Sequence, residues 1–465
     1  MDWSGKKVLV LGLGETGLSM TRWLVRHGAN VRVADSRTDP PHARTLAEEL
    51  PGVPVLRGPF GDDTFDDVDA VAISPGVDRR EPAVRRTLQR GVPVVGDVEI
   101  FAQAIARIAN ERGKRRPQVL AITGSNGKST VTSMTGEACK AAGRETVVAG
   151  NIGLPVLDAL ESAENGAPLP DVYVLELSSF QLESTSTLDP AAATVLNVTE
   201  DHLDRYDGMA DYAAAKARIF QGAGIQILNR LDTWSMSMAR AGREVVTFGT
   251  DAPRSDGDWG LAHGVLKRGD AALMRATDLS VAGLHNAANA LAALALGTAV
   301  DCPVQPMLEG LYGFRGLPHR LEKVAQIRGI SFYDDSKGTN VGATVAALGG
   351  MTSPTVLIAG GDGKGQDFSP LAPAVSAHAR AVVLIGRDAP LIEAVLASCG
   401  VALLRVRTIE DAVQAAYSAA RAGDAVLLSP ACASYDMFRS YVHRGECFVQ
   451  AVRALAAEQE GGRGE

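Results

Sequence analysis

No two of the five cysteines stand in a C-x-x-C pair, so the sequence lacks the spacing typical of zinc sites and redox centres. An odd number of cysteines without metal-ligand spacing indicates reduced thiols, as in a cytosol. No apolar run reaches about 18 residues, and no secretory signal peptide opens the sequence. These absences predict a cytoplasmic protein without membrane insertion.

An excess of positive charge is also missing. Lysine and arginine number 46 against 54 aspartates and glutamates, which leaves a net charge of −8 and argues against nucleic acid as a partner. One basic run, residues 107–117, is the exception, and an isolated charge run of this kind is expected to be a solvated linker. Hydrophobic residues make up 46% and charged residues 22%, as in a globular protein with a full core.

Short apolar runs alternate with helical patterns along the 465 residues. The runs are rich in Val, Ile and Leu, which is typical of parallel strands covered on both faces. We expect strands in KKVLVLG, VRVAD, AVAIS, VPVVG, QVLAITG, VYVLELS, AATVLNV, IQILN, ISFYDDS, TVLIAGG, AVVLIG and AVLLSPA. With boundaries at the basic run and at YGFRGLPHR, the sequence predicts an α/β protein of three domains, residues 1–112, 113–316 and 317–465.

The first strand runs into a glycine motif, VLVLGLGETG. Gly12, Gly14 and Gly17 match G-x-G-x-x-G, and Asp35 ends the next strand. This is the pattern of a dinucleotide site, with phosphate at a helix N-terminus and a carboxylate on a ribose. A nucleotide-sugar diphosphate can use the same helix end. The turn at residues 74–76 (SPG) is either a second phosphate loop or a plain turn.

The second glycine motif, TGSNGKST, predicts ATP binding. It follows a strand and precedes a helix, so the backbone N–H groups of residues 124–127 can cradle phosphate oxygens. Lys128 adds positive charge at the β/γ end, and a hydroxyl of Ser129 or Thr130 can reach Mg²⁺. The loop is shorter than a strict Walker A motif, which requires glycine where Ile122 stands.

Acidic residues stand near the carboxyl ends of the next two strands. Glu176 stands just before the carboxyl end of one strand, and His202 lies in an acidic cluster after the next. Parallel sheets build sites at this edge, and Mg²⁺ prefers oxygen ligands, so Glu176 is a candidate metal ligand. Lys216 stands in a helical pattern whose composition is that of an ordinary helix surface.

Several segments together resemble the Mur ligases, and within that family the D-glutamate-adding member. They are TGSNGKST, GNIGLP, LELSSFQLE, NVTEDHLDRY, GLHNAANALAA, GLPHRLE, DDSKGTNVGAT and LSPACASYDMF, and with the N-terminal motif they span nearly the whole chain in order. The resemblance implies a Rossmann-like N-terminal domain that binds a UDP substrate, a central P-loop ATPase domain with a mostly parallel sheet, and a Rossmann-like C-terminal domain that binds the acceptor.

The reaction that the resemblance implies is the ATP-dependent, Mg²⁺-requiring addition of D-glutamate to UDP-N-acetylmuramoyl-L-alanine through an acyl phosphate. It belongs to cytoplasmic peptidoglycan precursor synthesis, and we expect a monomer. A sister Mur-type or folylpolyglutamate-type ligase with another acceptor, L-glutamate included, stays open, because residue types do not show chirality. An NAD(P)-dependent oxidoreductase built on the first motif is a further alternative, but it leaves the second motif unexplained.

The resemblance also implies site residues. Catalysis falls on Lys128, Glu176, His202 and Lys216, the last as a carbamate. ATP contacts fall on Gly124, Ser125, Asn126, Gly127, Lys128, Ser129, Thr130, Asn289, Arg320 and Asp335. The implied metal ligands are Ser129, Thr130, Glu176, His202 and Lys216. The residues implied to bind the UDP substrate are Gly14, Thr16, Asp35, Arg37, Ser74, Pro75, Gly76 and Asn151. Acceptor contacts fall on Lys337, Thr339, Lys364, Ser434, Tyr435 and Tyr441, with backbone N–H groups if a helix begins near ASYDMF.

Overall fold

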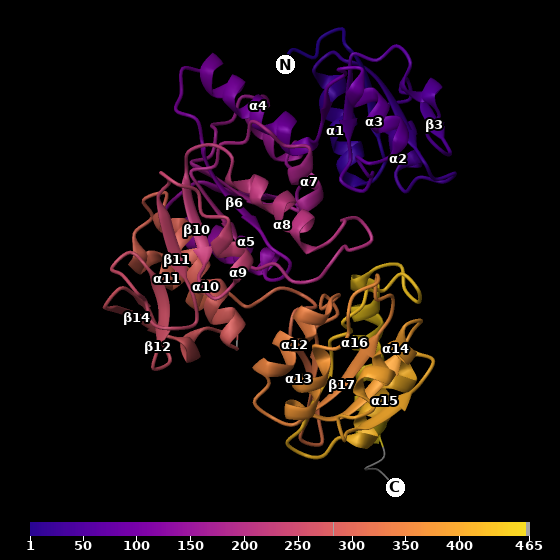
Figure 1. Ribbon diagram of the computed structural model, residues 1–465, viewed down its shortest axis with the longest axis vertical. Helices are drawn as coiled ribbons and strands as arrows, with labels where there is room; N and C mark the ends of the chain where they lie inside the picture. Colours follow the sequence, from indigo (N-terminus) through magenta and orange to yellow (C-terminus); the bar gives the residue numbers. More distant parts are fainter. Residues whose placement is uncertain (282, 462–465) are drawn as a thin grey trace. The chain divides into compact units, whose positions relative to one another are not determined.

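Three β-sheets follow one another along the chain in the computed structural model, which describes residues 1–281 and 283–461 (Figure 1). The first two sheets belong to one compact unit, residues 1–197, 210–274 and 289–312. The third sheet belongs to a second unit, residues 198–209, 275–288 and 313–465. The α/β class and the sheet of each predicted domain are thereby confirmed, whereas the domain boundaries stay a prediction.

The first sheet is fully parallel, with strand order β3-β2-β1-β4-β5. Its strands are β1 (Lys7–Leu11), β2 (Asn30–Asp35), β3 (Val55–Arg57), β4 (Ala70–Ile73) and β5 (Val94–Val95). The helices of this part are α1 (Glu15–Arg26), α2 (Ala43–Glu49), α3 (Pro82–Gln89) and α4 (Asp97–Glu111), with a 3-10 turn, η1 (Asp62–Phe65). This strand order is that of a Rossmann fold without its sixth strand, a fold in which ligands bind at the carboxyl ends of the strands.

The central sheet has nine strands in the order β14-β13-β12-β11-β10-β9-β6-β8-β7. Strands β6 to β11 pair in parallel, and β12 pairs antiparallel with β13. The bounds are β6 (Gln118–Thr123), β7 (Thr146–Gly150), β8 (Val172–Glu176), β9 (Ala192–Val195), β10 (Ile225–Asn229), β11 (Val245–Phe248), β12 (Trp259–Ala262), β13 (Val265–Arg268) and β14 (Ala271–Arg275). The expectation of a mostly parallel central sheet is confirmed.

Helices connect and flank these central strands. They are α5 (Lys128–Ala141), α6 (Glu161–Glu164), α7 (Ser179–Glu183), α8 (Met209–Ala217), α9 (Thr233–Ser237), α10 (Leu284–Thr298) and α11 (Val304–Gly313). Three 3-10 turns complete the set, η2 (Asp158–Leu160), η3 (Arg218–Phe220) and η4 (Ala276–Asp278). No helix among residues 1–281 and 283–461 is long and apolar enough to cross a membrane.

The third sheet has the order β15-β16-β20-β17-β18-β19, parallel except for the β15–β16 pair. Its strands are β15 (Glu322–Ile327), β16 (Ile330–Asp334), β17 (Thr355–Gly360), β18 (Ala379–Ile385), β19 (Ala402–Arg405) and β20 (Ala425–Leu428). The helices are α12 (Val341–Gly350), α13 (Leu371–His378), α14 (Ala389–Leu396), α15 (Ile409–Ala419) and α16 (Tyr441–Gly461).

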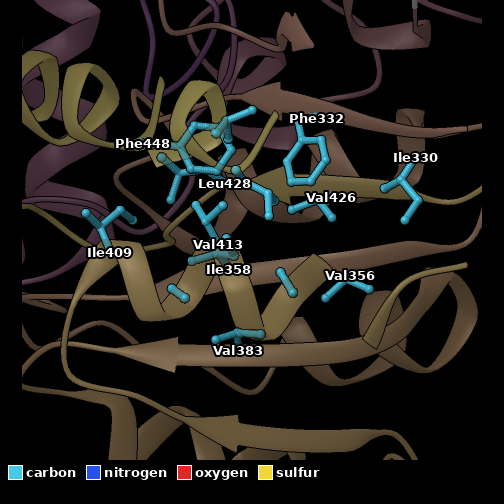
Figure 2. Close-up of a cluster of buried hydrophobic side chains, with 14 of the residues drawn as sticks. Ile330, Phe332, Val356, Ile358, Val383, Ile409, Val413, Val426, Leu428 and Phe448 are labelled. Carbon is cyan, nitrogen blue, oxygen red and sulfur yellow. The ribbon is translucent and has the colours of Figure 1, made fainter. Parts of the chain in front are cut away.

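Alternate residues of the inner strands face two separate cores, one on each face of the third sheet. Val356 and Ile358 of β17 pack with α15 and α16 in the cluster shown in Figure 2. Leu357 and Ala359 of the same strand pack with α12, α13 and α14 on the other face. Because both faces are covered, β17 is a nearly continuous apolar run, which explains why the sequence pattern identifies it.

The basic run is not a solvated linker along its whole length. Residues 107–111 form the last turn and a half of α4. The Arg112 guanidinium donates hydrogen bonds to the carbonyl oxygens of Ala163 and Ala167, at and after the end of α6. The expectation is therefore wrong for these residues, because the arginine satisfies carbonyl groups at the end of a helix instead of meeting only water.

Candidate functional site

The N-terminal glycine motif forms a tight turn from β1 into α1. Gly12 has φ +83°, in the left-handed region that favours glycine. A Cβ on Gly17 would overlap the carbonyl oxygen of Gly12, so this helix turn and the loop approach too closely for any side chain. Gly14 is the N-cap of α1, and Thr16 lies half-buried in its first turn. The turn thus presents a helix N-terminus at the carboxyl edge of the sheet, as anion binding requires.

Asp35 stabilises this turn through hydrogen bonds. Its carboxylate accepts hydrogen bonds from the backbone N–H of Leu13 at 2.7 Å and from the Arg37 guanidinium at 2.8 and 2.6 Å. Burial alone raises the pKa of Asp35, but the hydrogen bonds from Arg37 and Leu13 outweigh it and lower the pKa to about 2. Ser74 likewise donates to the Gly12 carbonyl at 2.8 Å. Asp35 and Ser74 therefore fix the conformation of the loop. Direct contacts between the predicted UDP-substrate residues and a substrate stay a prediction.

The second glycine motif leads from β6 into α5. Gly124 has φ +154° and Gly127, the N-cap of α5, has φ +82°. The Lys128 ammonium lies across the loop and donates to the carbonyl oxygens of Gly124 and Ser125, both at 2.7 Å. The sequence therefore positions a cation over a turn of backbone N–H groups, which is an arrangement for binding phosphate.

Two asparagines support the phosphate loop. Asn197, after β9, accepts from the Asn126 N–H at 2.8 Å and donates to its carbonyl oxygen at 3.0 Å. A Cβ on Gly127 would lie 2.8 Å from the Oδ1 atom of Asn289, so α10 also packs against the loop. The predicted ATP residue Asn289 thus lies beside the loop. Asn197 was missed, although its place at the end of a strand was a usable signal.

Lys216 is not a surface residue. Its side chain on α8 is buried, with 1% of its surface exposed, and its Nζ donates to the Gly124 carbonyl oxygen at 2.9 Å. The same oxygen binds Lys128 Nζ at 2.7 Å, so the two lysine nitrogens lie within about 6 Å of each other, a distance at which like charges repel appreciably. The composition of α8 suggested a surface lysine, but the side of this short helix that carries Lys216 is buried.

Glu176 ends β8 in the same unit. One carboxylate oxygen, Oε1, accepts from the Asn151 amide at 2.8 Å. The other, Oε2, is buried and has no hydrogen-bond partner within residues 1–281 and 283–461. A buried, half-satisfied carboxylate is costly unless a cation compensates it. With the buried hydroxyls of Ser129 and Thr130 on α5, the oxygen-donor set fits Mg²⁺.

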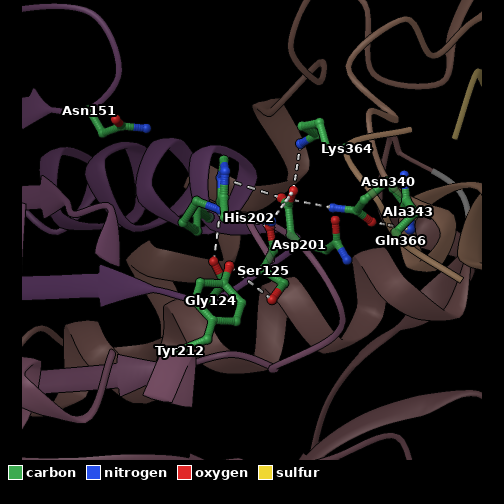
Figure 3. A network of polar contacts seen from close by, with 12 residues as sticks. Gly124, Ser125, Asn151, Asp201, His202, Tyr212, Asn340, Ala343, Lys364 and Gln366 are labelled. Atoms are coloured by element: carbon green, nitrogen blue, oxygen red, sulfur yellow. Dashed lines mark hydrogen bonds and ion pairs between the residues drawn. The ribbon is translucent and has the colours of Figure 1, made fainter. Parts of the chain in front are cut away.

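The second unit holds a polar cluster around Asp201 (Figure 3). The Lys364 ammonium forms an ion pair with its Oδ1 at 2.6 Å, and the Asn340 amide donates to its Oδ2 at 3.4 Å. The next residue, His202, has φ +57°, and its backbone N–H donates to the same carboxylate at 3.0 Å. Lys364 also has a positive φ, +52°. The predicted acceptor residue Lys364 and predicted metal ligand His202 are thus both held by Asp201, which the predicted site set omitted.

The loops at the carboxyl ends of β16, β17 and β20 meet in this unit. The Asp362 backbone pairs with that of Ala433, which joins the β17 and β20 loops. Buried Arg444 of α16 donates to the carbonyl oxygens of Ser336 at 2.8 Å and of Cys432 at 3.1 Å, which joins the β16 and β20 loops. Sequence reasoning also missed Arg444. An arginine inside the last helix carries no local signal of burial.

The predicted acceptor residues are distributed over these loops. Lys337 Nζ lies 3.9 Å from the centre of the Tyr441 ring, a cation–π distance. The Thr339 N–H donates to the Lys337 carbonyl at 2.8 Å. Ser434 is buried, whereas 76% of the Tyr435 side chain is exposed. These positions bring cations and hydroxyls to one edge of the third sheet, as a dicarboxylate would need.

No helix begins at ASYDMF. Residues 434–440 form turns in which the Ser434 carbonyl accepts from the N–H groups of Met437 and Phe438, and α16 begins only at Tyr441. The expectation of helix N–H donors beside Ser434 is therefore wrong.

Asp335, a predicted ATP residue, follows β16 and is buried. Its carboxyl group accepts from the Ser429 hydroxyl at 2.7 Å and from the Leu321 N–H at 3.3 Å. Burial raises the pKa of Asp335 to about 7, against the lowering effects of Ser429 and of the positive charge of Arg320. The predicted ATP residues Arg320 and Asp335 are thus near enough to interact electrostatically.

We expect Asp335→Asn to change the pH dependence of stability. Because the folded pKa lies above the unfolded one, the folded protein binds more protons, and Asp335 costs stability as the pH rises from about 4 to about 7. The asparagine cannot ionise. Between about pH 5 and about pH 8, the free energy of unfolding of the variant should rise relative to that of the wild type by on the order of 2 kcal/mol. Differential scanning calorimetry measures this difference.

Asp424→Asn serves as the control for this experiment. Asp424 pairs with Arg380, which lowers its pKa, so its replacement should give no such gain at high pH. An identical pH response of wild type and Asp335→Asn would contradict the raised pKa.

The fold and the two glycine loops are those of a nucleotide-binding protein, and comparison with known proteins gives the family. The chain belongs to the Mur ligase family: models of the Mur ligase MurD-like N-terminal domain, the Mur ligase middle domain and the Mur ligase glutamate ligase domain match residues 6–96, 122–297 and 319–432. A protein of Thiobacillus denitrificans, 60% identical over 99% of this chain and 98% of its own length, is named UDP-N-acetylmuramoylalanine--D-glutamate ligase. A 56% identical protein of Nitrosospira multiformis, with the same coverage, carries the same name.

Solved structures show the same fold. The UDP-N-acetylmuramate-alanine ligase of Thermotoga maritima aligns with a TM-score of 0.59 at 20% identity, over 97% of this chain and 100% of that one. MurF from Acinetobacter baumannii aligns with a TM-score of 0.60 at 16% identity, over 97% and 91%. At these identities the likeness concerns the fold alone.

Proposed function

We propose that this protein is the ATP-dependent ligase that adds D-glutamate to UDP-N-acetylmuramoyl-L-alanine in peptidoglycan precursor synthesis. The observation that carries the proposal is the 60% identity, over nearly the full length of both chains, to a relative of that name. The phosphate loop at residues 124–130 and the buried carboxylate of Glu176 support the chemistry. We further infer that the enzyme is a cytoplasmic monomer.

The first step activates the acid. A carboxylate and an amine do not condense unaided in water, so the substrate carboxylate attacks the γ-phosphorus of ATP, the bond to the bridging oxygen breaks, and ADP leaves. The product is an acyl phosphate. Such a transfer needs positioning and charge neutralisation more than covalent help. In this proposal the backbone N–H groups of residues 124–127 orient the phosphates and Lys128 faces the transferred group.

Glu176, the hydroxyls of Ser129 or Thr130, His202 and a carbamylated Lys216 would hold Mg²⁺. The ion supplies positive charge for the phosphate oxygens when bound. The unpaired Oε2 of Glu176 supports this role. The closeness of the two lysine nitrogens at Gly124 supports modification of Lys216, since a carbamate would replace repulsion by attraction.

The second step forms the amide. The amine of D-glutamate attacks the acyl carbon, a tetrahedral intermediate forms, and inorganic phosphate leaves. The amine must lose a proton, and His202 and the carboxylates beside it are the candidates. Lys337, Thr339, Lys364 and Ser434 would bind the two carboxylates of the acceptor, with Tyr435 and Tyr441 beside them.

Phosphate release with UDP-N-acetylmuramoyl-L-alanine tests the proposal against a panel of amino acids. We expect release with D-glutamate and little with any other amino acid. Faster turnover with L-glutamate would overturn the acceptor and leave the ligase chemistry standing. A nicotinamide absorbance change without ADP release would favour the oxidoreductase alternative.

We expect Lys364→Ala and Ser434→Ala to raise the KM for D-glutamate. Losing a hydrogen bond to a charged group costs about 1.5–3 kcal/mol, which is roughly 10- to 150-fold in affinity. The KM values for ATP and UDP-N-acetylmuramoyl-L-alanine should change little in steady-state kinetics. For Lys364 the effect includes the loss of its ion pair with Asp201.

Lys323→Ala is the matched control, because Lys323 lies on the edge strand β15 and is exposed. Equal increases in all three KM values for Lys364→Ala would contradict an acceptor role and indicate a general disturbance of the loops.

A further inference from the structure

The segment after Glu176 is held by a small hydrogen-bonded unit at the start of α7. Ser178 is the N-cap, and its Oγ accepts from the Gln181 N–H at 3.2 Å. In return, the Gln181 side-chain oxygen accepts from the Ser178 N–H at 3.1 Å. This capping box matters because α7 has only five residues, too few to be stable through its own backbone hydrogen bonds.

The other end of the Gln181 amide reaches a different part of the unit. Its Nε2 donates to Oδ2 of Asp97 at 3.0 Å. Asp97 is the first residue of α4, which follows the first sheet, and both side chains are buried. A carboxylate only accepts hydrogen bonds, so the amide must turn its NH₂ group to Asp97 and its oxygen to Ser178. Asp97 thereby selects the one amide orientation that closes the capping box.

Keeping Asp97 in this place is costly. Its second oxygen, Oδ1, is buried without a hydrogen-bond partner in the part of the chain that the structure describes. Burial raises the pKa of Asp97 to about 6. An apolar side chain would fill the same space without these costs. The acceptor-only character of the carboxylate is the property that the site uses.

The first turn of α4 is also tied to the segment that follows α7. Glu99 accepts from the N–H groups of Ser186 and Thr187 at 2.7 and 2.8 Å. The Gly96 N–H donates to the Ser184 carbonyl at 3.3 Å, and a Cβ on Gly96 would overlap the Ser184 hydroxyl. Asp97 is therefore at a fixed position from which it can orient Gln181.

We propose that Asp97 is a positioning residue for the metal side of the active site. Through the Gln181 amide it holds Ser178, and through Ser178 it fixes the backbone that follows Glu176. The inference rests on the proposed function, because Glu176 is taken as the residue that holds Mg²⁺. In this proposal Asp97 acts through Gln181 and is not itself a ligand of the metal.

A reciprocal exchange tests this role. Gln181→Glu places two carboxylates in buried contact, which should open the capping box. In Asp97→Asn/Gln181→Glu the asparagine NH₂ faces the new carboxylate, which still accepts from Ser178. Replacing outer partners of metal ligands typically costs about 10- to 100-fold in metal affinity. We expect Gln181→Glu to raise the Kd of Mg²⁺ by about tenfold or more and the double variant to restore it to within about threefold.

Two readouts are needed, Mg²⁺ titration of the ADP-bound protein by isothermal calorimetry and the Mg²⁺ dependence of phosphate release. Gln226→Glu is the matched control, because it makes the same chemical change at another buried glutamine, on β10, whose amide is hydrogen-bonded to backbone atoms of Met238 and Arg240. It should lower the melting temperature and leave the Kd of Mg²⁺ unchanged.

The proposal would be overturned if the double variant melts at the wild-type temperature but does not recover Mg²⁺ affinity. If Gln181→Glu does not fold, Asp97→Leu gives the test, since its amide partner is then free to turn, and an unchanged Kd of Mg²⁺ would overturn the proposal equally. A wild type that releases no phosphate but shows the expected order of Kd values would overturn the ligase function and leave the positioning role intact.

Discussion

Replacement of Lys128 by alanine is expected to abolish phosphate release while the protein stays folded. The Lys128 ammonium donates hydrogen bonds to the carbonyl oxygens of Gly124 and Ser125. In the proposed reaction it faces the transferred phosphoryl group. Groups that stabilise charge in the transition state contribute more to rate than to ground-state binding. The measurement is phosphate release at saturating ATP, with circular dichroism as the check on folding.

Lys140→Ala is the control for this variant. Lys140 lies in the last turn of the same helix, α5, and pairs at the surface with Glu137. Its loss should leave turnover unchanged. Turnover of Lys128→Ala near that of the wild type would contradict the assignment of the loop to ATP.

Lys216→Ala should nearly abolish activity, and a small carboxylate such as formate should restore part of it. The proposed carbamate carries the negative charge that the metal side requires, and a free carboxylate can occupy the space that the truncated side chain leaves. Lys216→Arg sharpens the test. It keeps a cation near Gly124 but cannot form the carbamate, so it should be as inactive as the alanine variant.

The modification itself is measured by carbon NMR after exposure to isotope-labelled bicarbonate, with Lys216→Arg as the blank. Full activity of Lys216→Ala without additives would show that the buried lysine is structural. Its hydrogen bond to Gly124 at 2.9 Å and its cation–π contact with the Tyr212 ring would then be part of a structural role.

The apolar runs predicted most inner strands and the edge strand β5, but not the inner strands β11, β12 and β13 or the edge strands β3, β7, β14, β15 and β19. β17 and β20 are buried along their whole length and read as unbroken apolar runs. β3, β14 and β19 stand at sheet edges and are largely exposed, so their sequences mix charged and apolar residues. An apolar-run criterion identifies burial on two faces, which an edge strand does not have.

The loops of the candidate site were predictable for a different reason. Gly12, Gly124 and Gly127 adopt positive φ angles that favour glycine, so the backbone requirement is visible in the residue type. The long-range supports are not visible in the residue type in this way, although Asn197 does stand after the end of a strand. Asn197, Asp201 and Arg444 act through contacts with residues far away in sequence, and Lys216 is buried by packing that no local pattern records.

The strand order of the third sheet has a consequence during synthesis on the ribosome. β20, the last strand to be made, lies between β16 and β17, with both of which it pairs in parallel. Until residues 425–428 have emerged from the exit tunnel, the nascent chain carries two half-sheets with unpaired inner edges. The first sheet closes with β5 near residue 95 and can fold while translation continues. We therefore expect the third sheet to be the part of the nascent chain that depends most on protection by chaperones.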